Sequence, residues 1–396
     1  MTLFSYPAKD LFQWLTSKED IVVLDVRNDK DFSRFKVESP YPFEMMNVSY
    51  YDFMEIENES VAKVPLDRSI RIVCAKEGSA KYVAEILVKH KAGDVGYLNG
   101  GIRTWGNLLV PKLVHTDKDY ELYQFIRPGK ASCSYGVIVD NELMLFDPSR
   151  NIDFYLEFAA EKKCKIVKTF ETHLQADYIA GSRFIAERTQ AEFLANELDF
   201  RLSKNKYSKL RDNQIHTFSS GKGPKIRVLF TPGHTPGSTS FIIDDRFMVS
   251  GDTVFIHSIG RPDLGGKAVE WAKLLFGTMN MVKKEARNMT ILPGHYIDWA
   301  EANSSLIFAA PFNDIVERNK NIYDIDTEED FIQFIQDNIR PQPEEYGTIR
   351  LVNANLKKVD EEEQETLDLG KNECAASAYA QAKAEAEKSA GEGCAI

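Results

Sequence analysis

The chain has 396 residues, of which 43% are hydrophobic and 28% are charged, so it can fill more than one globular core. Its formal net charge of −11 excludes the broadly basic surface that a nucleic-acid partner requires. The opening residues lack a basic segment followed by a long apolar one, and no stretch approaches the ~20 apolar residues that span a bilayer. We therefore expect no nucleic-acid partner, no membrane partner and no signal peptide.

The 5 cysteines are odd in number and scattered, without a CxxC pair. Such usage is typical of reduced thiols and not of a disulfide framework. We therefore expect a cytoplasmic protein, and we also expect it to form a homo-oligomer.

Residues 1–112 alternate apolar runs with helix-like segments. The runs IVVLDV (21–26), IRIVC (70–74) and VGYL (95–98) predict buried strands, and a run with helical periodicity follows the second of them. This alternation predicts a small parallel α/β domain.

Cys74 follows directly after one of these strands and precedes the helical run. A thiol in such a loop lies near backbone N–H groups and a helix N-terminus, which lower its pKa and make it a nucleophile. On position alone, Cys74 is better interpreted as a small buried core residue.

The segments VLDVRNDKDF (23–32) and LNGGIRTWG (98–106) flank Cys74, and with them the first domain resembles a rhodanese-like sulfurtransferase. The resemblance implies that Cys74 is catalytic and carries the transferred sulfane sulfur. It also implies structural roles for Asp25, Arg27, Gly100, Gly101 and Trp105.

The loop after Cys74 departs from the family pattern. The family has Gly three residues after the cysteine and Arg two residues further on, where this chain has Glu77 and Ser79. The loop thus loses a guanidinium and gains a carboxylate, which makes it less suited to an anion such as thiosulfate.

The segment VPKLVHTDKDY (110–120) predicts a linker to a second domain, which we place at residues 118–355. Paired apolar runs with turns at Asp140–Asn141 and Asp244–Asp245 predict hairpins. The segment FIAERTQAEFLANEL (184–198) predicts a helix between strands, so this domain belongs to the α+β class.

Residues 356–396 change character. The run VDEEEQE is acidic, and the stretch after it is rich in Ala, Glu and Lys, with few large apolar residues. Such a composition predicts an acidic, low-complexity C-terminal tail without a core of its own.

Polar residues follow the ends of four predicted strands in the second domain. His173 follows CKIVKTF, His234 lies in the loop TPGHTPGS, Asp252 follows FMVSG, and His295 follows MTILPG. Strand ends are where layered folds present their chemistry. Three histidines in such places, with Asp177 four residues beyond the first, predict a metal site.

The sequence segments around these residues resemble the motifs of the metallo-β-lactamase family, which implies an αββα sandwich. THLQADYIAG (172–181) corresponds to the family's THxHxDH segment. TPGHTPGS, SGDTVF and LPGH closely match other motifs of the family. A two-zinc member has imidazoles at positions 175 and 178, where this chain has Gln175 and Tyr178. Each of the two metal sites therefore lacks one ligand.

His173, His234 and Asp252 remain, and two imidazoles with one carboxylate are the ligand set of non-haem Fe(II) oxygenases. Within this fold the set is similar to that of the persulfide dioxygenases, which implies one Fe(II) per chain, with zinc as the alternative ion. The residues expected around the ligands, without binding the ion, are Gln175, Asp177, Tyr178 and His295.

GRPDLGG (260–266) resembles the persulfide-binding segment of those dioxygenases, which implies that Arg261 binds the substrate and that Asp263 supports it. The implied reaction oxidises a small-molecule thiol persulfide with O2 to sulfite, while Cys74 transfers sulfane sulfur and exchanges it with sulfite or thiosulfate. Two alternatives stay open: a zinc hydrolase of the glyoxalase II or lactonase kind, and a non-catalytic scaffold for sulfur relay or sensing.

Overall fold

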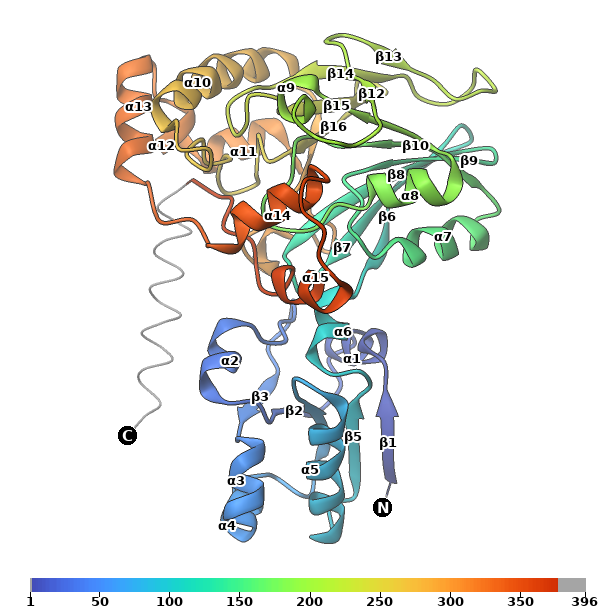
Figure 1. Cartoon of the computed structure of the whole chain (residues 1–396), viewed down its shortest axis with the longest axis vertical. Coiled ribbons are helices and arrows are strands. Elements are labelled where there is room, and N and C mark those ends of the chain that lie inside the picture. The colour runs from blue at the N-terminus through green and yellow to red at the C-terminus, as the bar shows by residue number, and fades with distance from the viewer. Residues whose placement is uncertain (1, 377–396) are drawn as a thin grey trace. The chain divides into compact units, whose positions relative to one another are not determined.

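The computed structural model describes residues 2–376, and the part of the expected tail at 377–396 lies outside the described residues. The chain forms two compact units (Figure 1). Of the described residues, the first unit contains those up to Val110 with Arg127–Lys130 and Leu369–Lys371, and the second contains the others.

The first unit is built on a five-stranded sheet with the order β1-β5-β4-β2-β3, in which every pair is parallel. Its strands are β1 (Thr2–Tyr6), β2 (Ile21–Asp25), β3 (Glu44–Asn47), β4 (Ser69–Val73) and β5 (Asp94–Leu98). Its helices are α1 (Ala8–Thr16), α2 (Asp29–Arg34), α3 (Tyr50–Glu55), α4 (Glu57–Ala62), α5 (Glu77–Lys89) and α6 (Ile102–Asn107). The inner strand β2 is buried at every position, as its unbroken apolar run predicts for a parallel sheet covered on both faces. The expected α/β class is confirmed.

Asp25, the last residue of β2, and Arg27 form a buried ion pair. Arg27 Nη2 lies 2.6 Å from Asp25 Oδ2, and the guanidinium also donates to the Phe35 carbonyl. Asn47 Nδ2 donates to the backbone carbonyl oxygens of both residues at 2.9 Å. These two hydrogen bonds connect the loop after β2 to the end of β3.

The second unit contains a seven-stranded sheet, β12-β11-β10-β9-β8-β7-β6, and a six-stranded sheet, β13-β14-β15-β16-β17-β18. The first of these sheets comprises β6 (Val110–Thr116), β7 (Glu121–Arg127), β8 (Ser132–Val139), β9 (Glu142–Phe146), β10 (Lys165–Phe170), β11 (Glu192–Ala195) and β12 (Ser208–Lys209). The other comprises β13 (Ile215–His216), β14 (Ile226–Phe230), β15 (Thr239–Ile243), β16 (Phe247–Gly251), β17 (Thr290–Pro293) and β18 (Ala310–Pro311).

The two sheets pack face to face through aromatic side chains. Phe241 of β15 lies 5.2 Å from Phe146 of β9 and 5.1 Å from Phe170 of β10, measured between ring centroids. Helices lie outside the sheets (Figure 1), which gives the expected αββα sandwich. They are α7 (Ile152–Glu161), α8 (Ser182–Thr189), α9 (Glu197–Phe200), α10 (Ala268–Glu285), α11 (Phe312–Arg318), α12 (Lys320–Tyr323), α13 (Glu328–Asp337), α14 (Glu345–Asn353) and α15 (Glu361–Leu367).

Both predicted hairpins are confirmed. β8 pairs antiparallel with β9, and Asp140 in the connecting turn has φ +50°. β15 pairs antiparallel with β16, and Asp244 and Asp245 have φ +57° and +49°. Positive φ at both central residues belongs to a turn whose twist matches that of the paired strands.

The predicted helix at 184–198 is wrong beyond Thr189. Gln190 adopts a left-handed conformation with φ +64° and ends α8, and the next residues form β11, which pairs parallel with β10. Buried Phe193 and Leu194 place this short run in the sheet, so tertiary packing overrides its helical composition.

The predicted linker is also folded, because Val110–Thr116 forms β6 at the edge of the seven-stranded sheet. The described part of the expected tail is ordered too. Glu361–Leu367 forms α15, and Asp368 makes a buried ion pair with Arg150 at 3.0 Å. The tail expectation relied on a shortage of large apolar residues, but Cys374 and Ala375 are buried in a hydrophobic cluster against which Val359 and Leu367 pack.

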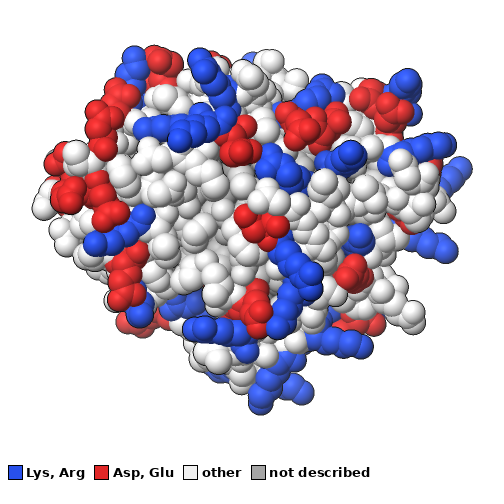
Figure 2. All heavy atoms as spheres, turned by 90° about the horizontal axis from the view of Figure 1, so that it is seen from above, with Lys and Arg blue, Asp and Glu red and all other residues white. Residues whose placement is uncertain are grey.

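Basic and acidic side chains are interspersed on the face that Figure 2 shows, and neither kind forms a continuous stripe there. Among residues 2–376, no helix combines the length and the apolar character needed to cross a membrane.

Candidate metal centre

His173 is presented by the loop that follows β10. Its Nδ1 lies 2.9 Å from Thr172 Oγ1, and the Thr172 hydroxyl donates to Asp147 Oδ2 at 2.8 Å. The Thr172 hydroxyl has one hydrogen, which it gives to Asp147, so it must accept in its contact with His173. His173 Nδ1 therefore carries the ring hydrogen and donates it to Thr172 Oγ1, which leaves Nε2 with a lone pair. Nε2 is buried without a hydrogen-bond partner among the described residues. Burial lowers the pKa of His173 to about 3, which keeps the ring neutral.

His234 lies in the loop between β14 and β15. Its Nδ1 is 2.9 Å from the backbone carbonyl oxygen of Arg261 and therefore donates to it. The remaining ring nitrogen, Nε2, faces Asp252 Oδ2 at 3.6 Å. The backbone of the segment GRPDLGG thus orients a candidate ligand.

Asp252 follows β16 after a turn that requires glycine. Gly251 has φ +51°, and a Cβ atom added there would lie 2.4 Å from Thr172 Oγ1. The missing side chain lets the end of β16 approach the end of β10 closely. This approach brings the Asp252 carboxylate next to the loop that carries His173.

His173, His234 and Asp252 converge as the sequence predicts, with one donor atom from each lying within 4.8 Å of the others. Asp252 Oδ2 lies 3.9 Å from His173 Nε2 and has no hydrogen-bond partner within residues 2–376. A buried carboxylate oxygen facing two imidazole lone pairs is costly unless a cation lies between them. These three residues therefore fit a metal ion.

His295 lies beside this set and contacts two carboxylates. Its Nδ1 is 2.7 Å from Asp252 Oδ1, and its Nε2 is 2.8 Å from Asp177 Oδ2. Burial disfavours the charged ring, but the carboxylates of Asp177 and Asp252 outweigh it and raise the pKa of His295 to about 10. Burial would likewise raise the pKa of Asp252, yet the neighbouring imidazoles, with His295 foremost, hold it below its usual range.

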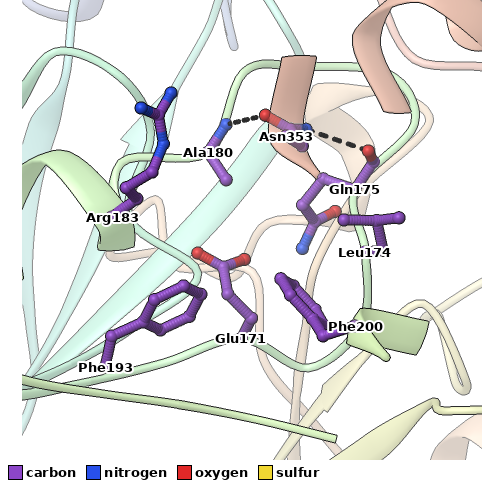
Figure 3. A pocket seen from close by; sticks show the side chains of 8 residues that line it. All are labelled: Glu171, Leu174, Gln175, Ala180, Arg183, Phe193, Phe200 and Asn353. Atoms are coloured by element: carbon purple, nitrogen blue, oxygen red, sulfur yellow. Dashed lines mark hydrogen bonds between the residues drawn. The ribbon is translucent and has the colours of Figure 1, made fainter. Parts of the chain in front are cut away.

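Gln175 and Tyr178, which stand where the family has imidazoles, turn to other partners. Gln175 points into a small pocket, toward Glu171 (Figure 3). Its backbone carbonyl accepts from Asn353 Nδ2 at 2.9 Å. The Tyr178 hydroxyl donates to the Asp147 carbonyl at 3.3 Å, while its ring packs edge-on against His295 at 6.0 Å.

Arg261 and Asp263, the expected substrate-binding pair, bind each other. Arg261 Nε donates to Asp263 Oδ1 at 2.7 Å, and its Nη2 donates to Asp263 Oδ2 and to the Arg340 carbonyl. Its Nη1 donates to the Glu373 carbonyl at 3.4 Å. The guanidinium is thus occupied by protein groups, two of which are backbone carbonyls.

Cys374 belongs to this centre and was missed by the sequence analysis. With Asp177 and His295 it forms a second group whose donor atoms lie within 4.8 Å of one another. Its thiol also bonds to the Asp252 carboxylate, and burial raises the pKa of Cys374 well above its usual range. No local pattern marks this residue, because it lies in a stretch that reads as a tail.

Glu171, directly before Thr172, is another buried acid that sequence reasoning did not single out. Burial raises its pKa well above the usual range, and Gln175 and Ser182 lie beside its carboxyl group.

Cys74, in the first unit, is 5% exposed between β4 and α5. Burial raises its pKa, although the backbone N–H groups of Lys76 and Ala75 act in the opposite direction. The expected lowering of this pKa is therefore wrong, because desolvation outweighs the loop amides. Glu77 Oε2 accepts from the Gly100 N–H at 2.9 Å, so this unusual residue ties the start of α5 to the loop after β5.

Comparison with known proteins separates two regions of the chain. The model of the metallo-beta-lactamase superfamily matches residues 128–302, and that of the rhodanese-like domain matches residues 8–108. A probable metallo-hydrolase of Bacillus subtilis (strain 168) is 25% identical over 156 residues, which are 34% of this chain and 71% of that protein.

Two of the solved structures that resemble the chain are compared with it by TM-score and sequence identity. A metallo-beta-lactamase from Staphylococcus aureus has a TM-score of 0.54 and 25% identity, over 62% of this chain and 75% of that one. ETHE1 from Myxococcus xanthus has a TM-score of 0.51 and 22% identity, over 60% of this chain and 99% of that one. At that identity the second likeness concerns the fold alone.

Proposed function

From a chain in which a rhodanese-like domain precedes a metallo-beta-lactamase domain, we propose a persulfide dioxygenase coupled to sulfane-sulfur transfer. The substrate is a low-molecular-weight thiol persulfide, and the overall reaction is RSSH + O2 + H2O giving RSH, sulfite and two protons. The ion is one Fe(II) per chain, held by His173, His234 and Asp252. Bound there, Fe(II) would supply the redox chemistry that allows a persulfide to react with O2.

One observation supports this proposal: His173 Nε2 and Asp252 Oδ2 are buried without a hydrogen-bond partner among the described residues, and a donor atom of His234 lies within 4.8 Å of the other two residues' donor atoms. Each ligand is oriented from behind by a hydrogen bond, through Thr172 for His173, through the Arg261 carbonyl for His234 and through His295 for Asp252. Such partners fix the tautomer and direction of a ligand before any ion binds. Two imidazoles and one carboxylate leave other positions for the reactants.

Arg261 and Asp263 are proposed to bind the carboxylate of the thiol. The Arg261 carbonyl contacts His234, so its side chain starts beside the ligand set. Asp263 holds the guanidinium through two oxygens, which fixes its plane and favours recognition of a planar anion. A substrate carboxylate would replace the carbonyls of Arg340 and Glu373, which are weaker partners for a guanidinium because they are uncharged.

Cys74 is proposed to exchange sulfane sulfur with thiols, sulfite or thiosulfate in the first unit. Its thiol is the one nucleophile that the rhodanese resemblance selects. The buried setting and the raised pKa make it a slow nucleophile at neutral pH. Anaerobic purification followed by metal analysis and O2 consumption with a panel of persulfides tests the whole proposal. A chain with two zinc ions and no O2 consumption would reject it.

A zinc hydrolase is the second candidate, and one observation favours it. The group Asp177, His295 and Cys374 lies beside the first, so the centre has enough ligands for two ions. The relative from Bacillus subtilis is a probable metallo-hydrolase. Hydrolysis of thioester and lactone panels by the zinc-loaded protein distinguishes this candidate from the first.

A further inference from the structure

A cavity lies beside the loop that carries His173. Its described lining includes Glu171 and Gln175, which precede and follow His173 in the chain, but none of the three candidate ligands of the first ion. The cavity has a volume of about 10 Å³, which is room for one water-sized group. This cavity is therefore separate from the candidate metal centre, although the same loop borders both.

Three buried oxygen atoms of this cavity have no hydrogen-bond partner among the described residues. They are both carboxyl oxygens of Glu171 and Oε1 of Gln175. The two residues are 1% and 2% exposed, and Figure 3 shows their side chains pointing toward each other. Buried acceptor oxygens without a donor are costly, so a donor group from outside the chain is favoured between them.

Arg183 also lines the cavity, but its guanidinium is engaged elsewhere. The guanidinium carbon lies over the Phe184 ring, 4.1 Å from the centroid, and Nη1 lies 3.9 Å from Glu187 Oε1. In Figure 3 the Arg183 side chain is turned away from the Glu171 carboxyl group. The cation nearest at hand in the lining therefore does not neutralise Glu171.

Two aromatic rings in the lining favour an organic cation. The ring centroids of Phe193 in β11 and Phe200 in α9 lie 5.7 Å apart, and Figure 3 shows the Glu171 carboxyl group between the two rings. Aromatic faces attract ammonium groups. A hard metal ion would require about six oxygen ligands, which a lining with two phenyl rings does not supply.

A groove of about 450 Å³ adjoins the cavity, and both are lined by Arg183 and Phe193. Residues of α8, of β11 and of the segment 206–208 form its other walls. A volume of this size is typical of a small-molecule site. A short chain attached to a group in the cavity therefore has room in the groove.

We propose that this cavity binds the primary ammonium group of a small-molecule amine. An ammonium group has three N–H donors, which match the three acceptor oxygens of Glu171 and Gln175, whereas a water molecule has only two. The bound form is an ion pair between the ammonium group and the Glu171 carboxylate, joined by charge-assisted hydrogen bonds. A protonated amine has no lone pair, so it does not bind to a metal ion. This site is independent of the ion and the reaction proposed for the metal centre.

Calorimetric titration of the metal-loaded, full-length protein with propylammonium at neutral pH tests the proposal. We expect one propylammonium ion to bind per chain. Propanol has the same carbon chain but a single donor and no charge, so it should bind at least about 10-fold more weakly. Tetramethylammonium, a cation without N–H donors, should not compete with propylammonium.

Glu171→Gln should weaken propylammonium binding by about 10- to 100-fold, because it removes the charged acceptor and keeps the volume. Glu192→Gln is the matched control, since Glu192 lines the groove and not the cavity, and it should keep the affinity of the wild type. Gln175→Leu removes the third acceptor and should weaken binding by about 10-fold. Circular dichroism of each variant verifies that the fold is kept.

Equal affinity of the wild type and Glu171→Gln for propylammonium, or equal affinity of the wild type for propylammonium and propanol, would overturn the ammonium site. A crystal structure grown with propylammonium that shows only a water molecule at Glu171 would also overturn it. These experiments measure binding and not turnover. Absence of O2 consumption would leave their results unchanged, so failure of the proposed function is distinguishable from failure of this site.

Discussion

His295 Nδ1 lies 2.7 Å from Asp252 Oδ1, and this contact decides where the other oxygen of Asp252 points. With Oδ1 engaged, Oδ2 faces His173 Nε2 at 3.9 Å and His234 Nε2 at 3.6 Å. His295 therefore positions Asp252, a proposed ligand of the first ion, without belonging to that proposed ligand set.

The three ligands of the first ion should be individually indispensable. His173→Ala, His234→Ala and Asp252→Ala each remove one of three donor atoms, so each should empty this position and abolish O2 consumption. Iron content and oxygen-electrode measurements check the expectation. A variant that keeps stoichiometric iron after such a change would show that the ion is bound elsewhere.

His295→Ala should weaken iron binding without removing it. Because the ring orients Asp252 from behind, its loss should reduce iron affinity by about 10- to 100-fold. Competition with a chelator measures the change, and His234→Ala is the reference for complete loss. If His295→Ala loses iron as fully as His234→Ala, then His295 is itself a ligand of that ion.

Thr172→Val should lower metal affinity by about 10-fold, because the hydroxyl that holds His173 Nδ1 is removed while the volume is kept. Thr169→Val is the matched control. Thr169 is fully buried, and its hydroxyl has no hydrogen-bond partner among the described residues, so this change should leave affinity unaltered. Equal chelator competition curves for the two variants would contradict the orienting role of Thr172.

Cys74→Ser should separate the two activities of the proposed enzyme. The change keeps size and removes a soft nucleophile, so sulfur transfer to or from thiosulfate should stop while O2 consumption with a small persulfide persists. Product analysis should show sulfite accumulating in place of thiosulfate. A fall in O2 consumption as deep as that of Asp252→Ala would mean that sulfur must pass through Cys74 to be oxidised.

His216 should make the second unit less stable as the pH falls. Burial, with the nearby Lys168 ammonium, lowers the pKa of His216 to about 4, below its unfolded value. The neutral His216 ring therefore makes its full contribution to the free energy of unfolding above the pKa of an unfolded histidine. That contribution is lost as the pH falls from there toward 4. The loss between pH 7 and pH 5 should be on the order of 1 kcal/mol after allowance for partial solvation. Denaturant unfolding of the metal-free protein measures it, and His216→Gln should remove that part of the pH dependence.

The sequence by itself determined both fold classes and three positions of the candidate metal centre. Unbroken apolar runs marked the buried parallel strands of the first unit, because a strand covered on both faces needs no polar positions. His173, His234 and Asp252 could be found because each follows a strand in a Gly- or Pro-constrained loop, which is a local signal. The short strand β11 was missed because its residues are compatible with a helix until β10 pairs with them.

Only the tertiary structure decided what surrounds those three residues. Cys374 lies far along the chain from Asp177 and His295, and the bonds of its segment to Arg261, Ile259 and Tyr346 bring it to them. Burial raises the pKa of the Cys74 thiol, which the sequence predicted to be lowered. Desolvation depends on the packing around the sulfur and not on its neighbours in sequence. Local patterns therefore identify candidate ligands at strand ends, whereas a candidate from a distant segment, such as Cys374, is brought there by long-range contacts that sequence spacing does not encode.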